Sequence, residues 1–372
     1  MILLLYTIIL FSFSIYSYAL IDPNLTLINN STWVTFRNVM VNLGYYHRDT
    51  SWSVYLGLVI FLFVFHFIFM KYSAKYNALK IALLISIFLL FSYPFLSHDF
   101  FNYIFDAKII TVYHQNPYIH KALDYPADHW IRFMQWTHRT YPYGPTWLLI
   151  TLIPSFLSFG KFILNFILFK LMFTFFYLMA VYYLNKMNKK WALFFATNPL
   201  IIIEGLISSH NDLVAVSIAI VGIYYLLQNK KYGSRLLLLL SGGIKYITLP
   251  FLFLHKSDSG QARMTSFWGP KGHQNLLVFI SLVSLLLYLT FSSEIQPWYF
   301  LALFALLPYY EKIILKLNIL CAGLLLSYYP YIRLGGWDSA NKVYLKHEII
   351  AFFLLCSLLR ITFFHERTAP SA

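Results

Sequence analysis

The sequence predicts an all-α polytopic membrane protein with about ten full transmembrane helices. Apolar residues make up 59% of the 372 residues and charged residues only 11%, which is too little charge to cover the surface of a soluble protein. The apolar residues are gathered in runs of about 20, the length at which a helix crosses about 30 Å of hydrocarbon. These two observations exclude an ordinary soluble domain.

The net charge of +14 comes from 28 Lys and Arg against 14 Asp and Glu. In a soluble protein this excess would suggest nucleic acid as a partner, but here the basic residues cluster in short loops between apolar runs. Such loops orient a membrane protein, so the expected partner is a lipid bilayer and not nucleic acid. The two cysteines, Cys321 and Cys356, both fall in apolar runs, which leaves no disulfide framework or zinc motif.

The expected spans follow one another along the chain. They cover residues 2–21, 52–70, 80–96, 162–185, 191–208, 213–228, 274–292, 298–310 with its extension, 317–332 and 344–363. We interpret the first run as a retained anchor instead of a signal peptide, because it has no basic n-region and no convincing small-residue cleavage site. Residues 1–372 are expected to form a single transmembrane domain without a separate soluble domain.

Basic loops orient these spans. The basic residues of the short loops are Lys71, Lys75, Lys80, Lys186, Lys189, Lys190, Lys230, Lys231, Arg235, Lys312 and Lys316, and Arg360 flanks the last span. When all of them are placed inside, the N-terminus is inside and residues 97–145 are outside. Most acidic residues then lie outside, so we expect the polar chemistry on the outer face.

Two apolar segments do not fit this alternation as full spans. Residues 145–160 are short, contain Pro154 and end at Lys161, so we expect a helix that lies along the membrane surface. Residues 236–254 are split by polar residues and glycines into two halves of about nine residues each. A re-entrant pair of short helices, with Lys245 at its outer tip, preserves the orientation of every later loop.

The outer segment 97–145 carries a dense set of polar and aromatic side chains. Asp99 directly follows an apolar run, with His98 beside it, at the predicted membrane boundary. Asp99, Tyr103 and Asp106 are spaced at i, i+4 and i+7, which places them on one face of a short helix. A carboxylate there can act as a general base on an attacking hydroxyl, assisted by His98 or Asp106; otherwise Asp99 only caps the helix.

Two rigid turns occur in the same segment. Asn116 and Tyr118 belong to an Asn-Pro-Tyr turn, and Tyr141 and Tyr143 belong to a Tyr-Pro-Tyr-Gly-Pro turn that starts the next helix. Arg139 precedes the second turn and is a candidate partner for a phosphate. The aromatic rings either stack on a sugar face or form the aromatic belt that is usual at a membrane surface.

A tight outer turn is formed by His210, Asn211 and Asp212, three consecutive polar residues between two apolar runs. His210 can contact a phosphate, whereas Asn211 or Asp212 can simply cap the following helix. Glu204 lies within the preceding run, where a charge is costly unless it is paired, so we expect it to face the bundle interior.

Lys245 follows Ser-Gly-Gly-Ile at the break of the split segment. An ammonium group and free backbone N–H groups at this place suit a phosphate or pyrophosphate, and the alternative is a lysine that snorkels at a helix end. Gln296, Trp298 and Tyr299 form a third outer turn, which again contains a proline and aromatic residues.

The outer segment also raises the question of a metal. It contains five histidines, namely His98, His114, His120, His129 and His138. None shows the close pairing of a zinc helix or finger, so we assign no cofactor and leave a divalent metal open. The sequence has no Gly-rich nucleotide loop and no serine nucleophile elbow.

Together, these motifs resemble a known family. In order, they are Asp99, Asn-Pro-Tyr at 116–118, YPYGPTW at 141–147, NPLIIIEGLISSHND at 198–212, Lys245 and QPWY at 296–299. The ordered set resembles integral-membrane glycosyltransferases with the GT-C fold, in particular bacterial polyprenol-phosphate-mannose-dependent α-mannosyltransferases and their relatives. The resemblance covers roughly residues 80–310, and the two spans before residue 80 have no counterpart in it.

The resemblance implies an inverting transfer of a hexose, here taken as mannose, from a polyprenyl-phosphate donor to a glycan or glycolipid acceptor. The transfer would take place on the outer face of a multi-pass protein in a bacterial inner or plasma membrane, as part of cell-envelope synthesis. Asp99 matches the essential acidic residue of the family, and the outer loop 97–161 matches the family's loop with juxtamembrane helices.

The residues are consistent with this chemistry. As the lipid phosphate leaves, nearby cations must stabilise its negative charge. The candidates for this role are Lys245, His210 and Arg139. The main alternative is a transporter or flippase of lipid-linked glycans, for which a broken helix such as 236–254 is typical. A polymerase or ligase that uses the same donor would need a large outer loop in the C-terminal half, where 333–346 is short.

Overall fold

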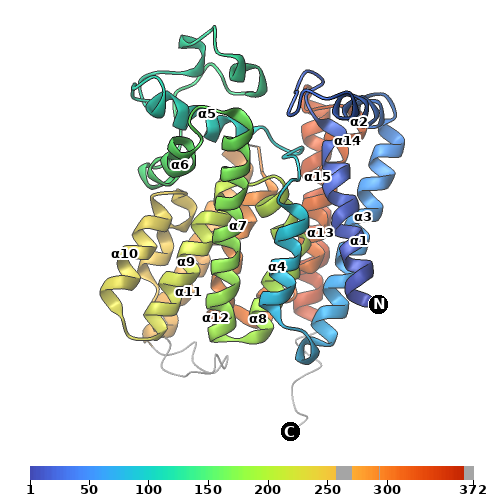
Figure 1. The fold of residues 1–372 in the computed structure, drawn as a ribbon. Helices are drawn as coiled ribbons and strands as arrows, with labels where there is room; N and C mark the ends of the chain where they lie inside the picture. The colour runs from blue at the N-terminus through green and yellow to red at the C-terminus, as the bar shows by residue number, and fades with distance from the viewer. Residues whose placement is uncertain (257–269, 293, 364–372) are drawn as a thin grey trace.

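The computed structural model describes residues 1–256, 270–292 and 294–363, and all regular structure in these ranges is helical (Figure 1). The α-helices are α1 (Ile2–Tyr16), α2 (Ser31–Val41), α3 (Arg48–Lys71), α4 (Ala78–Leu89), α5 (Asp99–Thr111), α6 (Pro145–Leu157), α7 (Phe162–Met187), α8 (Lys189–Thr197), α9 (Asn211–Leu227), α10 (Lys231–Gly242), α11 (Pro270–Ser292), α12 (Leu307–Ile314), α13 (Asn318–Leu326), α14 (Tyr329–Leu334) and α15 (Ala340–Phe363). The 3-10 segments are η1 (Ser17–Leu20), η3 (Ser73–Lys75), η4 (Ala122–Asp124), η5 (His129–Phe133), η7 (Tyr246–Phe253) and η9 (Pro297–Leu306), and the π-helical segments are η2 (Asn42–Tyr46) and η6 (Ile201–Ile207).

Within the part of the chain that the structure describes, three helices are long and apolar enough to cross a membrane: Ile2–Leu20, Arg48–Lys71 and Phe162–Met187. Two bent pairs, Lys189–Thr197 with Ile201–Ile207 and Pro297–Ile314 with Asn318–Leu334, raise the number to five if each pair is one span. The chain is therefore a helical membrane protein. The described residues do not confirm about ten spans, because several expected spans are short or are bent by 66° and 117° at their breaks.

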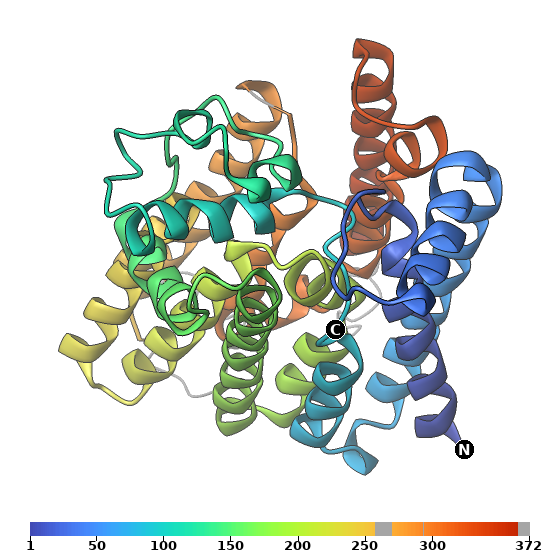
Figure 2. The ribbon, with the colours of Figure 1, turned by 45° about the horizontal axis from the view of Figure 1, so that its top comes forward.

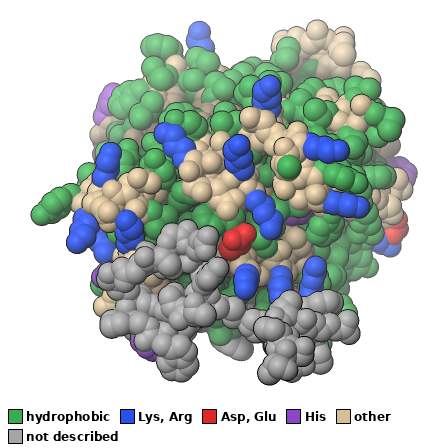
Figure 3. Space-filling view, turned by 90° about the horizontal axis from the view of Figure 1, so that it is seen from below, with side chains coloured by type: hydrophobic (Ala, Val, Ile, Leu, Met, Phe, Trp, Pro, Cys, Tyr) green, Lys and Arg blue, Asp and Glu red, His purple; other side chains and the backbone are tan. Residues whose placement is uncertain are grey.

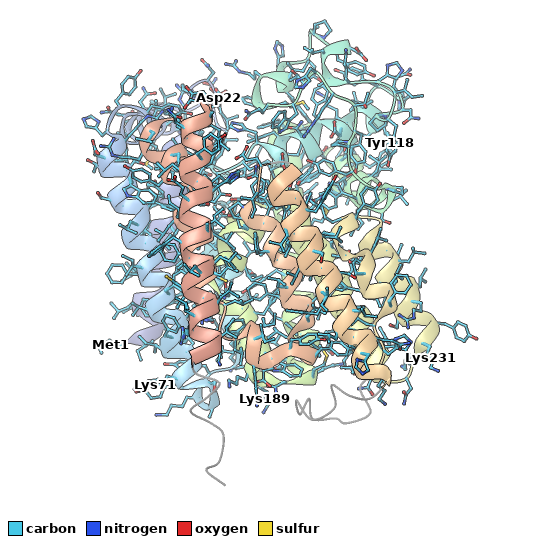
Figure 4. The ribbon with its side chains drawn as sticks, turned by 180° about the vertical axis from the view of Figure 1, so that it is seen from behind. Met1, Asp22, Lys71, Tyr118, Lys189 and Lys231 are labelled. Carbon is cyan, nitrogen blue, oxygen red and sulfur yellow. The ribbon has the colours of Figure 1, made fainter. Side chains whose placement is uncertain are left out.

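The two ends of the bundle differ in charge. Met1, Lys71, Lys189 and Lys231 lie at one end, and Asp22 and Tyr118 lie at the other (Figure 4). Figure 3 looks onto the first end, where Lys and Arg side chains are spread over the visible face and few acidic side chains accompany them. We call this the basic end and the opposite one the site end. Lys71, Lys189 and Lys231, which belong to three of the basic loops named in the sequence analysis, thus lie at the same end of the bundle.

The long loop at the site end is ordered, as expected. Helix α5 lies there, with its residues from Phe100 to Ile109 all buried. Figure 2 shows this helix and the following loop over one side of the bundle, whereas α1, α3 and α15 stand together on the other side. The loop has a small core of its own, formed by Phe105, Ile109, Ala122 and Met134.

The predicted helix at 145–160 and the predicted break at 241–245 are both present. Helix α6 begins at Pro145, directly after the turn at Gly144. Helix α10 ends at Gly242 and η7 begins at Tyr246, so the break leaves Lys245 in the turn. The turn and α6 meet closely, since a Cβ atom on Gly144 would lie 2.0 Å from the carbonyl oxygen of Gly243. Only glycine fits at this contact.

Helices α8, η6 and α9 form the most deeply buried part of the chain. Asn198 interrupts the α-helix before η6, and its side chain accepts a hydrogen bond from the backbone N–H of Leu200 at 3.0 Å. After η6, Ser209 has a φ of 59°, in the left-handed region, and α9 then starts at Asn211. This irregular stretch brings Glu204 and His210 to the same place, where the site forms.

Candidate active site

Asp99 occupies the first position of α5, at the site end of the bundle. Its backbone N–H donates to the Ser97 hydroxyl at 3.2 Å, and 13% of its side chain is exposed. Burial raises the pKa of this carboxyl, while the positive charges of Lys245 and Arg139 and hydrogen bonding by Trp136 and Tyr143 act to lower it. Asp99 is thus a carboxylate that is mostly enclosed and close to cations, but that solvent can still reach.

His210 is a titratable neighbour of Asp99 on the inner side. Its Nδ1 atom is 3.8 Å from Asp99 Oδ2 and its Nε2 atom is 3.4 Å from Glu204 Oε2. The side chains of His210 and Glu204 are completely buried, which confirms the expected inward orientation of Glu204. Because His210 is enclosed and both ring nitrogens face carboxylates, it is not placed to meet a substrate phosphate.

Lys245 forms the positive side of the site. Its Nζ atom lies 2.9 Å from Asp212 Oδ2 and donates to Asn211 Oδ1 at 3.3 Å. The rings of Tyr143 and Tyr299 are within 5.9 and 5.3 Å of the same ammonium group. With 18% of its side chain exposed, Lys245 is paired and aromatic-lined but open on one side.

The tyrosines of the outer loop join these groups. The Tyr103 hydroxyl accepts a hydrogen bond from the backbone N–H of Asn211 at 3.5 Å, and its ring packs edge-on against Tyr143. Tyr141 is buried between Tyr118 and Tyr143, and the Tyr118 hydroxyl donates to the backbone carbonyl of Tyr143 at 3.3 Å. The two predicted turns therefore form one aromatic wall beside Asp99.

The predicted turn at 296–299 closes the site from the C-terminal half. The Trp298 ring stacks on the His210 ring, with centroids 3.7 Å apart and planes inclined by 16°. Gln296 does not reach this cluster; its Oε1 atom accepts a hydrogen bond from Lys346 Nζ at 2.8 Å, and Glu294 Oε1 lies 2.6 Å from the same nitrogen. Buried Lys346 of α15 thus fixes the turn that carries Trp298.

Three predicted residues have other surroundings. His98 packs its ring against Phe101, and Asp22 is the charge that acts on it. Asn116 is exposed and accepts a hydrogen bond from the backbone N–H of Tyr118 at 3.0 Å, so it shapes its own turn. Asp106 is buried, and burial raises its pKa to about 8, with Arg139 lowering it and Asp99 raising it. A carboxyl that is protonated at neutral pH cannot serve as a base there.

Arg139 and the loop histidines lie at the rim. Arg139 is exposed and rests over the Trp136 ring at 4.5 Å. Within residues 1–256, 270–292 and 294–363, no group of three or more His, Cys, Asp or Glu side chains is placed to hold a metal ion. The site that the described residues form is thus made of one accessible carboxylate, paired buried charges and aromatic rings.

Two buried lysines that hold the turns of the site in place were not predicted from the sequence. Lys170 in α7 donates to the backbone carbonyls of Leu206 and Ile207 at 2.5 and 3.1 Å and to the Ser209 hydroxyl at 3.1 Å. Lys346 has the role described above. Both are charges within apolar runs, and such residues usually serve a function or a partner, which is the signal that could have identified them.

The site agrees with what a comparison with protein families shows. Residues 23–256 match the family model described as alpha-(1->6)-mannopyranosyltransferase, N-terminal domain. Comparisons with curated proteins and with solved structures gave no match. The matched residues include Asp99, Glu204, the His210–Asp212 turn and Lys245, and they decide in favour of an enzyme over a transporter. The chain therefore belongs to this family of alpha-mannosyltransferases and is a membrane glycosyltransferase.

Proposed function

We propose that the protein transfers a mannosyl unit from a polyprenyl-phosphate donor to a hydroxyl of a glycan or glycolipid acceptor, with inversion at C1. The acceptor oxygen attacks C1, the bond from C1 to the phosphate oxygen breaks, and polyprenyl phosphate leaves. The acceptor proton passes to Asp99. Because the family makes α-linkages, an inverting transfer requires a β-linked donor.

The observation that carries this proposal is the environment of Asp99. It combines limited exposure of the carboxylate with the nearby charges of Lys245 and Arg139 and the aromatic wall of Tyr103 and Tyr143. A general base must be reachable by the hydroxyl that it deprotonates, and of the two carboxylates on this face of α5 only Asp99 has that access. Aromatic rings beside it are suited to pack against a sugar.

Lys245 is the proposed partner of the donor phosphate, with Arg139 and Tyr299 beside the approach to it. In the structure its charge is balanced by Asp212, and its exposed part remains free for a further oxygen ligand. A preorganised cation stabilises the charge that grows on the leaving phosphate as the bond breaks. Asn211, Tyr118, Tyr141 and Trp298 would support these groups from behind.

We further propose that the site end faces outside and that the shorter helices also contribute to about ten spans, as the sequence predicts. The gathering of lysines at the basic end supports this orientation, since positive loops remain on the inner side. The α10–η7 hairpin would be re-entrant, with its irregular turn covered by α6. A donor with a prenyl chain could then reach Asp99 directly from the bilayer.

The test is transfer of labelled mannose from synthetic polyprenyl-phosphate mannose in membranes that contain the wild type or Asp99→Asn. We expect Asp99→Asn to lower the rate at least a hundredfold, the lower range for loss of a general base. Asp124→Asn, an exposed carboxylate of the same loop, is the matched control and should remain active. Full activity of Asp99→Asn would exclude Asp99 as the base. A wild type that is inactive with every polyprenyl-phosphate hexose would exclude this class of donor.

A further inference from the structure

His210 lies in line between two carboxyl groups from different elements. Asp99 comes from the start of α5 and Glu204 comes from the π-helical segment η6, and the imidazole is held between them at 3.8 and 3.4 Å. Its ring is completely buried, and among the described residues neither ring nitrogen has a hydrogen-bond partner at shorter range. Asp99 and Glu204 thus face the two nitrogens, and the 3.8 Å separation from Asp99 must shorten for a hydrogen bond to form.

The ring is fixed in this orientation. Trp298 covers one face by stacking, and the backbone N–H of His210 donates to the Glu204 carbonyl at 3.0 Å. Lys170 holds the carbonyls of Leu206 and Ile207 just before the turn. These contacts orient the ring so that Nδ1 faces Asp99.

The two oxygens of Asp99 can then have separate tasks. Oδ2 is the oxygen that faces His210, so the acceptor hydroxyl would approach Oδ1, sharing the carboxyl with the hydrogen bonds of Trp136 and Tyr143. The charged and titratable groups around the pair come from every neighbouring element: Lys245, Arg139, Tyr143, Asp106, Asp212, Tyr103 and Tyr299 around Asp99, and Lys346, Tyr328 and Tyr55 around Glu204. His210 is the group that faces both carboxyls.

We propose that His210 is the positioning residue of the base, donating its Nδ1–H to Asp99 Oδ2 while Glu204 holds its Nε2 side. The assignment of Asp99 as the base rests on the function proposed above. Either Nε2 accepts a hydrogen bond from a protonated Glu204, or Nε2 is itself protonated and donates a hydrogen bond to an ionised Glu204. These two states contain the same number of protons, and in both of them Asp99 is ionised and receives the Nδ1–H bond.

This arrangement has a measurable consequence for Asp99. A hydrogen bond to the charged form of a carboxyl favours that form, so His210 opposes the effect of burial and keeps Asp99 ionised. Loss of the donor should therefore raise the pKa of Asp99. At a pH below the new pKa most of the enzyme would hold a protonated base that cannot accept the acceptor proton.

The test uses substitutions that separate the donor from the ring. His210→Phe keeps a ring for Trp298 to stack on and removes both nitrogens. His210→Asn and His210→Leu both lose the ring and have similar shapes, but the Asn amide nitrogen is attached at the same position as Nδ1. His120→Phe, on an exposed histidine of the outer loop, is the matched control.

The first measurement is an infrared titration of the purified protein, in which the carboxyl band of Asp99 is identified by its loss in Asp99→Asn. We expect His210→Phe and His210→Leu to raise the midpoint of this band by one pH unit or more, and His210→Asn and His120→Phe to remain near the wild type. Equal midpoints for His210→Asn and His210→Leu would overturn the proposal, even if His210→Phe failed to fold.

The second measurement is the pH dependence of kcat/KM for mannose transfer. The acidic limb should move to higher pH in His210→Leu by the same amount as the infrared midpoint, with activity at least tenfold lower near neutral pH and recovering at higher pH. A purely structural role would lower activity equally at all pH values. Because the infrared titration needs no substrate, it tests the contact with Asp99 even if the proposed donor proves wrong.

Discussion

At the scale of single residues, Lys245 and Asp212 form an ion pair in which a buried carboxylate balances the charge proposed to bind phosphate. Asp212 is 2% exposed and Lys245 neutralises it, so loss of the lysine leaves an uncompensated buried carboxylate. Removal of one partner of a buried pair typically costs about 3–5 kcal/mol, a value reduced here because Lys245 is partly exposed. If Lys245 binds the donor phosphate as proposed, stability and donor binding are coupled in this pair.

We expect Lys245→Met to lower the melting temperature and to raise KM for the polyprenyl-phosphate donor at least tenfold. The double variant Lys245→Met/Asp212→Asn should recover most of the stability, because the buried charge is gone, but not the donor affinity. Thermal unfolding in detergent and steady-state transfer rates measure the two effects. Recovery of the donor KM in the double variant would contradict a role of Lys245 in phosphate binding.

Asp106 gives a pH-dependent prediction. Burial raises its pKa to about 8, whereas an unfolded Asp titrates near 3.9. Between these values the folded chain holds a proton that the unfolded chain has released, so this residue makes stability fall as pH rises. Asp106→Asn should remove that fall, seen as a flatter melting temperature between pH 5 and 8 (approximate limits set by the two pKa values). An unchanged slope would contradict the raised pKa.

The sequence indicated Asp99 as the candidate base, but not that His210 and Glu204 lie together beside it. The reason is geometric. Asp99 directly follows an apolar run, so its position at a membrane boundary can be inferred from the sequence. Glu204 and His210 are six residues apart, a spacing that a regular α-helix does not place on one face. Only the π-helical segment η6 and the left-handed Ser209 bring them together, and neither has a sequence signal.

At the scale of elements, Lys170 joins α7 to the irregular stretch before α9. Its ammonium group satisfies carbonyls that the end of η6 would otherwise leave without a partner, and it also contacts the hydroxyls of Ser92 and Ser209. Hydrogen bonds from charged groups contribute about 1.5–3 kcal/mol each. The shape of the turn that presents His210 therefore depends on one buried cation.

We expect Lys170→Met, which keeps the aliphatic part of the side chain, to destabilise the protein by about 3 kcal/mol or more. Transfer activity should fall as well, because the His210 turn loses its anchor. Lys161→Met, at an exposed lysine just before the same helix, should have neither effect. Melting curves and initial rates provide the measurement, and equal stability of the two variants would refute the role of Lys170 as an anchor.

The helical elements could be predicted better than their number of membrane crossings. The helix at Pro145–Leu157 and the break before Tyr246 appear where proline, glycine and polar residues indicate them. Hydropathy alone could not show that the runs near 191–208 and 298–332 are bent, because their apolar composition continues through the breaks. Bends of this kind are set by tertiary packing and by residues such as Asn198.

At the scale of the whole molecule, the orientation can be tested with single cysteines. Ile119 lies at the site end next to Tyr118, and Tyr232 lies at the basic end next to Lys231; their exposed fractions are 71% and 94%. In a background of Cys321→Ser and Cys356→Ser, we expect Ile119→Cys in intact cells to react with a membrane-impermeant maleimide. Tyr232→Cys should react only after permeabilisation. The reverse pattern would invert the proposed orientation.

Trp298 and Lys346 lie outside residues 23–256, yet one covers His210 and the other holds the turn that carries it. The range that matches the family model therefore ends within the set of residues that form the candidate site. A polypeptide that ended near residue 256 would contain the proposed base but would leave its imidazole uncovered. Residues beyond the matched range thus contribute to the candidate site.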